Sequence, residues 1–233
     1  MRILITGATG MIGSGVLLEC LESPLVTSVV TLGRRATGRS HHKLTEIEHA
    51  DLNDLRPLYA ELSGFDGCFW CLGISSVGLT EEVYSNITYS YTQSAVSTLL
   101  QTSPGVRFVF VSGEGATQDP EGSVMWARVK GRAERAVLDA GLRDAVVFRP
   151  AFVQPLKGVT SRTRLYRYAY ALARPVLPLL RLALPGYVST TVEMGAAMIA
   201  FVARGLPADA DRVLDSRGMR ALAERLPRDM EDA

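Results

Sequence analysis

Short apolar runs alternate with amphipathic stretches over the first two thirds of the chain. Each run is short enough for one buried strand, and the stretches between them carry apolar residues at helical spacing. We expect strands at residues 3–5, 26–32, 44–50, 65–72, 106–111 and 144–148, and helices near residues 16–21, 53–62, 80–103 and 123–140. This alternation predicts an α/β fold, a Rossmann-like doubly wound parallel sheet with helices on both faces.

The pattern changes after Pro150, where helical stretches replace the strand–helix alternation. Helices are expected at residues 163–173, 192–204 and 219–226. Residues 175–185 are apolar but interrupted by prolines, and they are far short of the about 20 residues that a transmembrane helix needs. Core packing is the favoured interpretation of this segment. A lid, a dimer surface or a peripheral membrane contact are the alternatives.

One domain accounts for the whole pattern. We expect residues 1–233 to form a single NAD(P)-binding unit, with a cofactor-binding core at residues 1–150. Residues 151–233 would then form a small C-terminal helical region that contacts substrate or acts as a lid.

Composition narrows the functional classes. The 233 residues are 47% hydrophobic and 21% charged, with a formal net charge of +1, which disfavours nucleic-acid binding. Three cysteines, Cys20, Cys68 and Cys71, are too few for a disulfide framework, and no secretory signal is visible. We therefore expect a cytoplasmic protein. Cys68 and Cys71 lie in one apolar run and are interpreted as core cysteines, and no metal-binding cluster is present.

The first apolar run ends in three glycines, Gly7, Gly10 and Gly13, and a helical stretch follows. Gly7 allows a sharp turn, Gly10 lets a pyrophosphate approach the backbone, and Gly13 lets the helix pack closely on the strand. This order directs backbone N–H groups and a helix N-terminus at a phosphate. It favours a dinucleotide site over an ordinary turn.

The residues at the end of the second strand indicate which dinucleotide the protein binds. An NAD site usually has an acidic residue there, but this chain has Arg34 and Arg35. A guanidinium group suits the oxygens of a 2′-phosphate, so we predict NADP(H) in preference to NAD(H). The alternative is that both are solvated loop arginines. Asp51 is expected to accept a hydrogen bond from the adenine amino group or to cap a helix, with Leu52 packing on the ring.

Several motifs together resemble the short-chain dehydrogenase/reductase superfamily in its atypical or extended branch, and most closely the epimerase-like and Tat-interacting-protein-like reductases. They are Thr6-Gly-Ala-Thr-Gly-Met-Ile-Gly13, Gly33-Arg-Arg35, Asp51-Leu52, Cys71-Leu-Gly73, Val111-Ser-Gly-Glu-Gly-Ala116, Lys130-Gly-Arg-Ala-Glu134 and Phe148-Arg-Pro150. The resemblance implies that Leu72 and Gly73 line the cofactor and that residues 150–153 pass near its nicotinamide end. The full predicted cofactor set is Gly7, Thr9, Gly10, Met11, Ile12, Gly13, Arg34, Arg35, Asp51, Leu52, Leu72, Gly73, Lys130, Pro150, Phe152 and Val153.

The catalytic half of the resemblance is incomplete. The superfamily uses Tyr-x-x-x-Lys on a helix, and here Trp126 stands at the Tyr position while Lys130 is in place. An indole donates a hydrogen bond but cannot relay a proton. The assisting Ser is displaced too, since the usual Ser pair is Ser112-Gly113. Lys130 and Ser112 remain the predicted catalytic residues. Other candidate proton sources, none singled out by spacing, are Tyr84, Tyr89, Tyr91, Tyr187, Ser189 and Glu114.

Two functions fit these observations. The first is an NADP(H)-dependent oxidoreductase or epimerase-like enzyme that acts on an unidentified small molecule with a non-standard acid–base group. The alternative is a catalytically silent NADP(H) binder that serves as a redox sensor or partner-docking protein. The resemblance also implies a homodimer.

Overall fold

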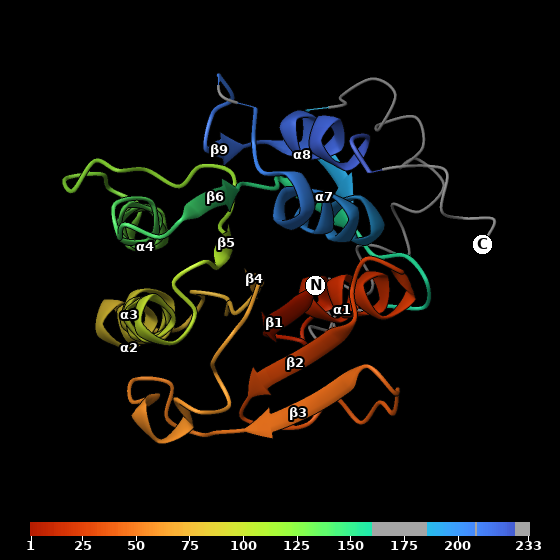
Figure 1. The fold of residues 1–233 in the computed structure, drawn as a ribbon. Coiled ribbons are helices and arrows are strands. Elements are labelled where there is room, and N and C mark those ends of the chain that lie inside the picture. The colour runs from red at the N-terminus through yellow and green to blue at the C-terminus, as the bar shows by residue number, and fades with distance from the viewer. Residues whose placement is uncertain (160–185, 208, 227–233) are drawn as a thin grey trace.

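The parallel sheet predicted from the sequence is present. A computed structural model describes residues 1–159, 186–207 and 209–226, and within them a seven-stranded parallel sheet has the order β3-β2-β1-β4-β5-β6-β9 (Figure 1). Its strands are β1 Arg2–Thr6, β2 Ser28–Gly33, β3 Leu44–Glu48, β4 Gly67–Trp70, β5 Arg107–Val111, β6 Asp144–Phe148 and β9 Val213–Leu214. The chain order reverses between β1 and β4, and ligand crevices form at such switch points, beyond the carboxyl ends of the strands.

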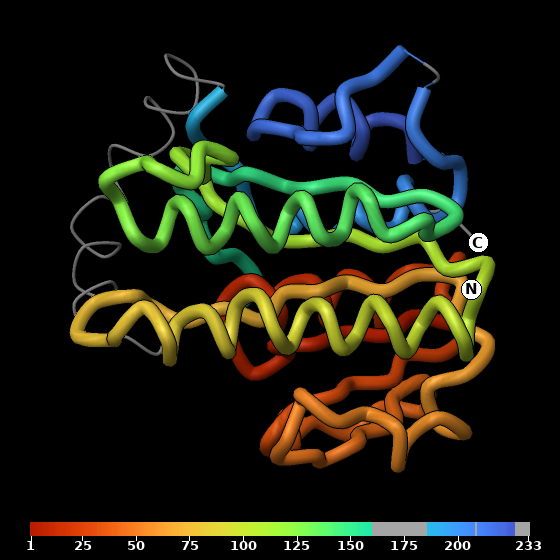
Figure 2. The backbone as a smooth tube through the Cα atoms, turned by 90° about the vertical axis from the view of Figure 1, so that its left-hand side faces the viewer, coloured from red at the N-terminus to blue at the C-terminus, as the bar shows by residue number. Residues whose placement is uncertain are grey.

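Helices cover both faces of the sheet, which confirms the doubly wound prediction. One face carries α1 (Met11–Glu22), α7 (Thr191–Arg204) and α8 (Ser216–Ala223) (Figure 1). The other carries α2 (Glu81–Ser85), α3 (Tyr91–Thr102) and α4 (Met125–Leu138). Figure 2 shows α3 and α4 side by side across that second face.

The core has two layers because successive side chains of a strand point to opposite faces. On β1, Ile3 and Ile5 pack toward α1 and α7, whereas Leu4 packs toward the opposite layer with Trp70 and Phe108. Both faces of the central strands are covered, so β1, β4 and β5 are largely buried apolar runs, whereas the edge strand β3 is only partly buried.

Helix α1 and helix α7 approach closely through two glycines. A Cβ atom on Gly15 would lie 2.5 Å from Cβ of Thr191, and one on Gly195 would lie 2.5 Å from Cγ of Glu19. The start of α7 is fixed by a capping box between Thr190 and Glu193. These contacts attach the C-terminal part of the chain to the helix that follows the glycine loop.

The predicted helix at residues 53–62 is wrong. Only a short 3-10 turn, η1 (Arg56–Leu58), forms there. The Asp54 carboxylate accepts hydrogen bonds from the backbone and the guanidinium group of Arg56, at 3.1 and 2.8 Å. Such a local side-chain bond stabilises a turn at the expense of a helix.

Other differences concern short or interrupted elements. The expected helix at residues 80–103 consists of α2, a π-helical turn η2 (Asn86–Ser90) and α3. Three strands were not predicted. Two of them, β7 (Phe152–Gln154) and β8 (Val188–Thr190), pair in parallel, and the third, β9, extends the main sheet beside β6. Helix α8 begins earlier than expected because the Asp215 carboxylate caps it through the Gly218 amide, at 2.8 Å.

The predictions for residues 163–173 and 175–185 lie outside the described residues. Within the described part of the chain, none of the helices is long and apolar enough to cross a bilayer.

Candidate functional site

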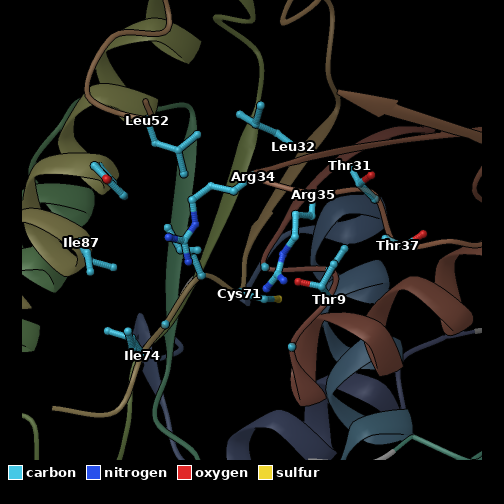
Figure 3. Close-up of a pocket in the computed structure, with 17 residues that line it drawn as sticks. Thr9, Thr31, Leu32, Arg34, Arg35, Thr37, Leu52, Cys71, Ile74 and Ile87 are labelled. Atoms are coloured by element: carbon cyan, nitrogen blue, oxygen red, sulfur yellow. The ribbon is translucent and has the colours of Figure 1, made fainter. Parts of the chain in front are cut away.

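A cavity of about 230 Å³ lies at the carboxyl ends of β1, β2 and β4, at the switch point of the sheet (Figure 3). The glycine loop, the loop after β2 and the loop after β4 each contribute to its wall. The lining residues are Gly7, Ala8, Thr9, Gly10, Thr31, Leu32, Gly33, Arg34, Arg35, Thr37, Leu52, Cys71, Leu72, Gly73, Ile74, Ile87 and Tyr91.

Close backbone contacts in and beside the glycine loop leave no room for a side chain at Gly7 or Gly13. Gly7 has φ +66°, and a Cβ atom on it would lie 2.4 Å from the Cys71 carbonyl oxygen. A Cβ atom on Gly13 would lie 2.2 Å from the Gly7 carbonyl oxygen, so Gly13 lets α1 pack closely on the backbone that directly follows β1. Gly10 precedes α1, and no side chain in the described structure caps that helix. The first-turn amides therefore remain available to an anion.

Two cationic side chains project into this cavity. Arg34 lies on the side of Leu52 and Ile87, and Arg35 lies on the side of Thr9 (Figure 3). Neither arginine forms an ion pair within the described residues, and the cavity wall there contains no carboxylate. The site consequently presents two unpaired positive charges beside the glycine loop.

An apolar wall completes the cavity. Leu52 is buried and faces it, together with Ile87 from η2 and Tyr91 at the start of α3. Asp51 is exposed and lies outside the cavity wall, and its carboxylate accepts the Asn53 amide at 3.0 Å. Sequence analysis missed Ile87, which the π-helical turn directs toward the crevice, an arrangement often found at functional sites.

The thiol of Cys71 also faces the cavity, whereas Cys68 is fully buried. Cys68 is thus the core residue that was expected, and Cys71 is partly buried and packs against the core while it also lines the cavity. Burial raises the pKa of the Cys71 thiol to about 12. A thiol with so high a pKa is a weak nucleophile at neutral pH, so the pair does not form a redox motif.

The cavity does not include every predicted cofactor residue. Eight lie outside its wall: Met11, Ile12, Gly13, Asp51, Lys130, Pro150, Phe152 and Val153. Met11 and Ile12 pack against the core instead, and Val153 is part of it. Phe152 donates its amide to the Tyr187 carbonyl at 3.0 Å. For these eight the cofactor contact stays a prediction.

Lys130 lies in α4 below the carboxyl end of β5. Its ammonium group donates to the Val111 carbonyl at 3.3 Å and lies 5.5 Å from the centre of the Phe110 ring. Burial lowers the pKa of Lys130 to about 8, and the charge of Glu134 partly opposes this shift. Trp126, one turn earlier on the helix, packs against Gly115 in the loop after β5.

Ser112 belongs to a buried polar cluster that the sequence did not reveal. Its hydroxyl donates to the carboxylate of Glu134, which is 0% exposed. Arg149 donates to both oxygens of the same carboxylate, at 2.9 and 2.5 Å. The Ser112 hydroxyl hydrogen is thereby engaged within the fold, and its catalytic role stays a prediction. Glu134 and Arg149 each lie in a sequence motif that resembles the superfamily, and this was the one feature of the sequence that could have drawn attention to them.

The remaining candidate proton sources occupy different places. Tyr91 lines the cavity, Tyr84 is buried, and the Arg132 guanidinium lies 4.3 Å above the ring of Tyr89. Tyr187 is exposed, and Ser189 donates to Ser216 at 2.7 Å. Glu114 is exposed, and its amide is bonded to the Pro150 carbonyl. Among the described residues no group of three potential ligands could hold a metal ion.

A model of the NAD dependent epimerase/dehydratase family matches residues 3–124, just over half of the chain. The chain belongs to this family. The glycine loop, the β2 end and the β4 end all fall within the matched residues. The resemblance to the extended, epimerase-like branch of the short-chain dehydrogenase/reductase superfamily is confirmed.

Fungal relatives give a further comparison. Protein fmp52, mitochondrial, from Emericella nidulans is 26% identical over 162 residues, which cover 65% of this chain and 66% of that protein. Protein FMP52, mitochondrial, from Candida albicans is 26% identical over 158 residues, covering 64% and 66%. The chain thus matches slightly less than two thirds of each relative. These names contradict the cytoplasmic prediction, which rested partly on cysteine content, a property that reports the redox state of a compartment and not its identity.

Solved structures share the fold at low identity. The Bordetella bronchiseptica enzyme WbmF, in complex with NAD+, has a TM-score of 0.66 at 16% identity over 96% of this chain and 76% of that one. UDP-glucuronic acid 4-epimerase from Bacillus cereus, in complex with NAD, has a TM-score of 0.68 at 14% identity over 92% and 78%. Both comparisons support the Rossmann architecture of the sheet.

Proposed function

We propose that this protein is an NADP(H)-dependent oxidoreductase or epimerase-like enzyme that acts on a small molecule. The observation that carries the proposal is that Arg34 and Arg35 line a cavity to which the described residues contribute neither an ion-pair partner nor a carboxylate. A carboxylate at the end of β2 would accept hydrogen bonds from the ribose hydroxyls of NAD and would repel a 2′-phosphate. Two guanidinium groups in its place favour the phosphorylated ribose.

The residues present fit this cofactor. Gly7, Gly10 and the uncapped N-terminus of α1 would hold the pyrophosphate, because neither glycine has a side chain to obstruct it. Leu52 and Ile87 would pack against the adenine ring, and the two arginines would bind the 2′-phosphate. The nicotinamide of the bound dinucleotide supplies hydride-transfer chemistry.

Lys130 and Trp126 would act near the other end of the cofactor. Lys130 changes its charge near pH 8, so it can hold or release a proton close to neutral pH. Trp126 can donate a hydrogen bond but has no titratable proton in this range. The chain therefore retains a charged group for positioning, while the usual phenolic relay is missing.

Replacing both Arg34 and Arg35 with alanine should weaken NADPH binding at least tenfold, since a charged hydrogen-bonded pair contributes about 1.5–3 kcal/mol. NADH has no 2′-phosphate and should bind with nearly unchanged affinity. Calorimetric titration with each dinucleotide measures both effects. Arg39→Ala is the matched control, because Arg39 lies on the same loop, is exposed and does not line the cavity. Wild-type protein that binds NADH as tightly as NADPH would contradict the proposed preference.

The silent NADP(H) binder remains a second candidate, and Trp126 is the observation that favours it. If only the proton relay is missing, Trp126→Tyr should raise NADPH oxidation with a panel of carbonyl compounds by about 100-fold, the lower range for general acid catalysis. Trp126→Phe, which lacks a titratable hydroxyl, is the control and should give no increase. Absence of turnover in both the wild type and Trp126→Tyr would favour the binding protein over the enzyme.

A further inference from the structure

The loop that carries both arginines is attached to strand β3 by one carboxylate. Oε2 of Glu46 accepts the backbone N–H of Thr37 at 2.6 Å and the hydroxyl of Thr31 at 3.2 Å. Thr31 lies in β2 directly opposite Glu46 in the register of the two strands. One carboxylate oxygen thus joins the loop, β2 and β3.

Hydrogen bonds hold both ends of the short segment that carries the two arginines. On one side, the Gly33 carbonyl accepts the His49 amide at 2.9 Å, which holds the end of β2. On the other side, Glu46 holds the amide of Thr37. Only residues 34–36 lie between these two points, so the backbone that carries Arg34 and Arg35 has little freedom left. Arginine side chains that start from a fixed backbone lose less entropy when they bind a ligand.

Glu46 forms no ion pair with either arginine. Neither Arg34 nor Arg35 comes within ion-pairing distance of a carboxylate in the described residues, and Glu46 does not line the cavity. Its Oε2 atom accepts hydrogen bonds from the two threonines. The loop therefore gains an anchor while the arginines keep their charge for the ligand.

We propose that Glu46 is a positioning residue for cofactor specificity, which holds the loop after β2 so that Arg34 and Arg35 face a 2′-phosphate. This inference rests on the proposed function, because it assigns a role in the discrimination between NADPH and NADH. It differs from the acidic residue of an NAD site, which stands at the end of the second strand and touches the ribose itself.

The test compares Glu46→Ala, Glu46→Gln and the control Glu48→Ala. Glu48 lies on the same strand and is exposed. Glu46→Ala should weaken NADPH binding about tenfold, the effect of one or two lost hydrogen bonds to a charged acceptor, and change NADH binding less than twofold. The side-chain carbonyl of Gln can accept from both threonines, so Glu46→Gln should stay within about threefold of the wild type for NADPH. Glu48→Ala should change neither affinity.

A second measurement needs no cofactor. Hydrogen exchange at the Thr37 amide should become at least tenfold faster in Glu46→Ala than in the wild type or Glu48→Ala, because this half-buried N–H group loses its acceptor. Unchanged exchange, or equal losses of NADPH and NADH affinity, would overturn the inference. Tighter NADPH binding by Glu46→Gln than by the wild type would overturn it as well, because the carboxylate would then oppose the phosphate.

The two measurements separate this inference from the proposed function. If the wild type binds NADPH no better than NADH, the proposed preference fails, and the specificity role of Glu46 fails with it, whatever the exchange rates are. If the wild type prefers NADPH and Glu46→Ala keeps the same preference, only the role of Glu46 is overturned.

Discussion

Replacing Glu134 with alanine should lower the free energy of unfolding by about 3–5 kcal/mol, the cost of removing one partner of a buried ion pair. The carboxylate of Glu134 is fully buried and accepts from Arg149 and Ser112. Its removal leaves the guanidinium group of Arg149 without a counter-charge and the Ser112 hydroxyl without an acceptor. Denaturant unfolding of the purified variant measures the loss.

Two further variants show whether the charge pair causes this loss. Ser112→Ala removes only the neutral donor and should cost about 1 kcal/mol. The double variant Glu134→Leu/Arg149→Met replaces the pair by apolar side chains and should recover most of the stability, since such replacements are often neutral. A loss below about 1 kcal/mol in Glu134→Ala would contradict the view that this cluster is a major stabilising contact of the fold.

The sequence was sufficient for features that depend on neighbouring residues. Five of the six strands found near their predicted positions, β1, β2, β4, β5 and β6, are largely apolar and buried, and such runs need no knowledge of the partner strand. The sixth, β3, lies at the sheet edge and has a loose alternation of apolar and polar residues. The glycine loop was recognisable for the same reason, because Gly7, Gly10 and Gly13 stand between a strand and a helix. The small strand pair β7–β8 was not, because a three-residue segment has no periodicity to detect.

The residues of the site also differ in whether the local sequence predicts them. Arg34 follows β2 directly and Leu52 lies in the loop after β3, so the topology brings both to the carboxyl edge of the sheet, and both line the cavity. Ile87 lines the cavity because it lies in a π-helical turn, and no local sequence pattern predicts such a turn. Glu134 and Arg149 lie on different elements, and their pairing depends on how α4 packs against β6. Side chains whose role requires a distant partner are therefore the ones that sequence analysis missed.

Lys130→Met should raise the free energy of unfolding at pH 7 by about 2 kcal/mol, and this gain should disappear as the pH approaches 10.5. Burial lowers the pKa of Lys130 from 10.5 to about 8 in the folded protein. Below pH 8 both states carry the proton, and the folded state bears the full cost of the buried charge, about 3 kcal/mol for a shift of this size. Lys130→Met also removes the hydrogen bond to the Val111 carbonyl, and this loss offsets roughly 1 kcal/mol of the gain from removing the buried charge.

Between pH 8 and pH 10.5 the unfolded chain binds more protons at this position than the folded chain, so the Lys130 contribution makes wild-type stability rise with pH. Lys130→Met removes that contribution, and the difference between the two proteins should shrink across this window. Arg132→Met on the same helix is the matched control, because Arg132 is exposed and its loss should give a difference that does not vary with pH. Urea unfolding of all three proteins at pH 7, 8.5 and 10 measures this. A Lys130→Met protein that is destabilised equally at every pH would mean that the ammonium charge is fully compensated in the fold, and Lys130 would then not be available to exchange a proton near neutral pH.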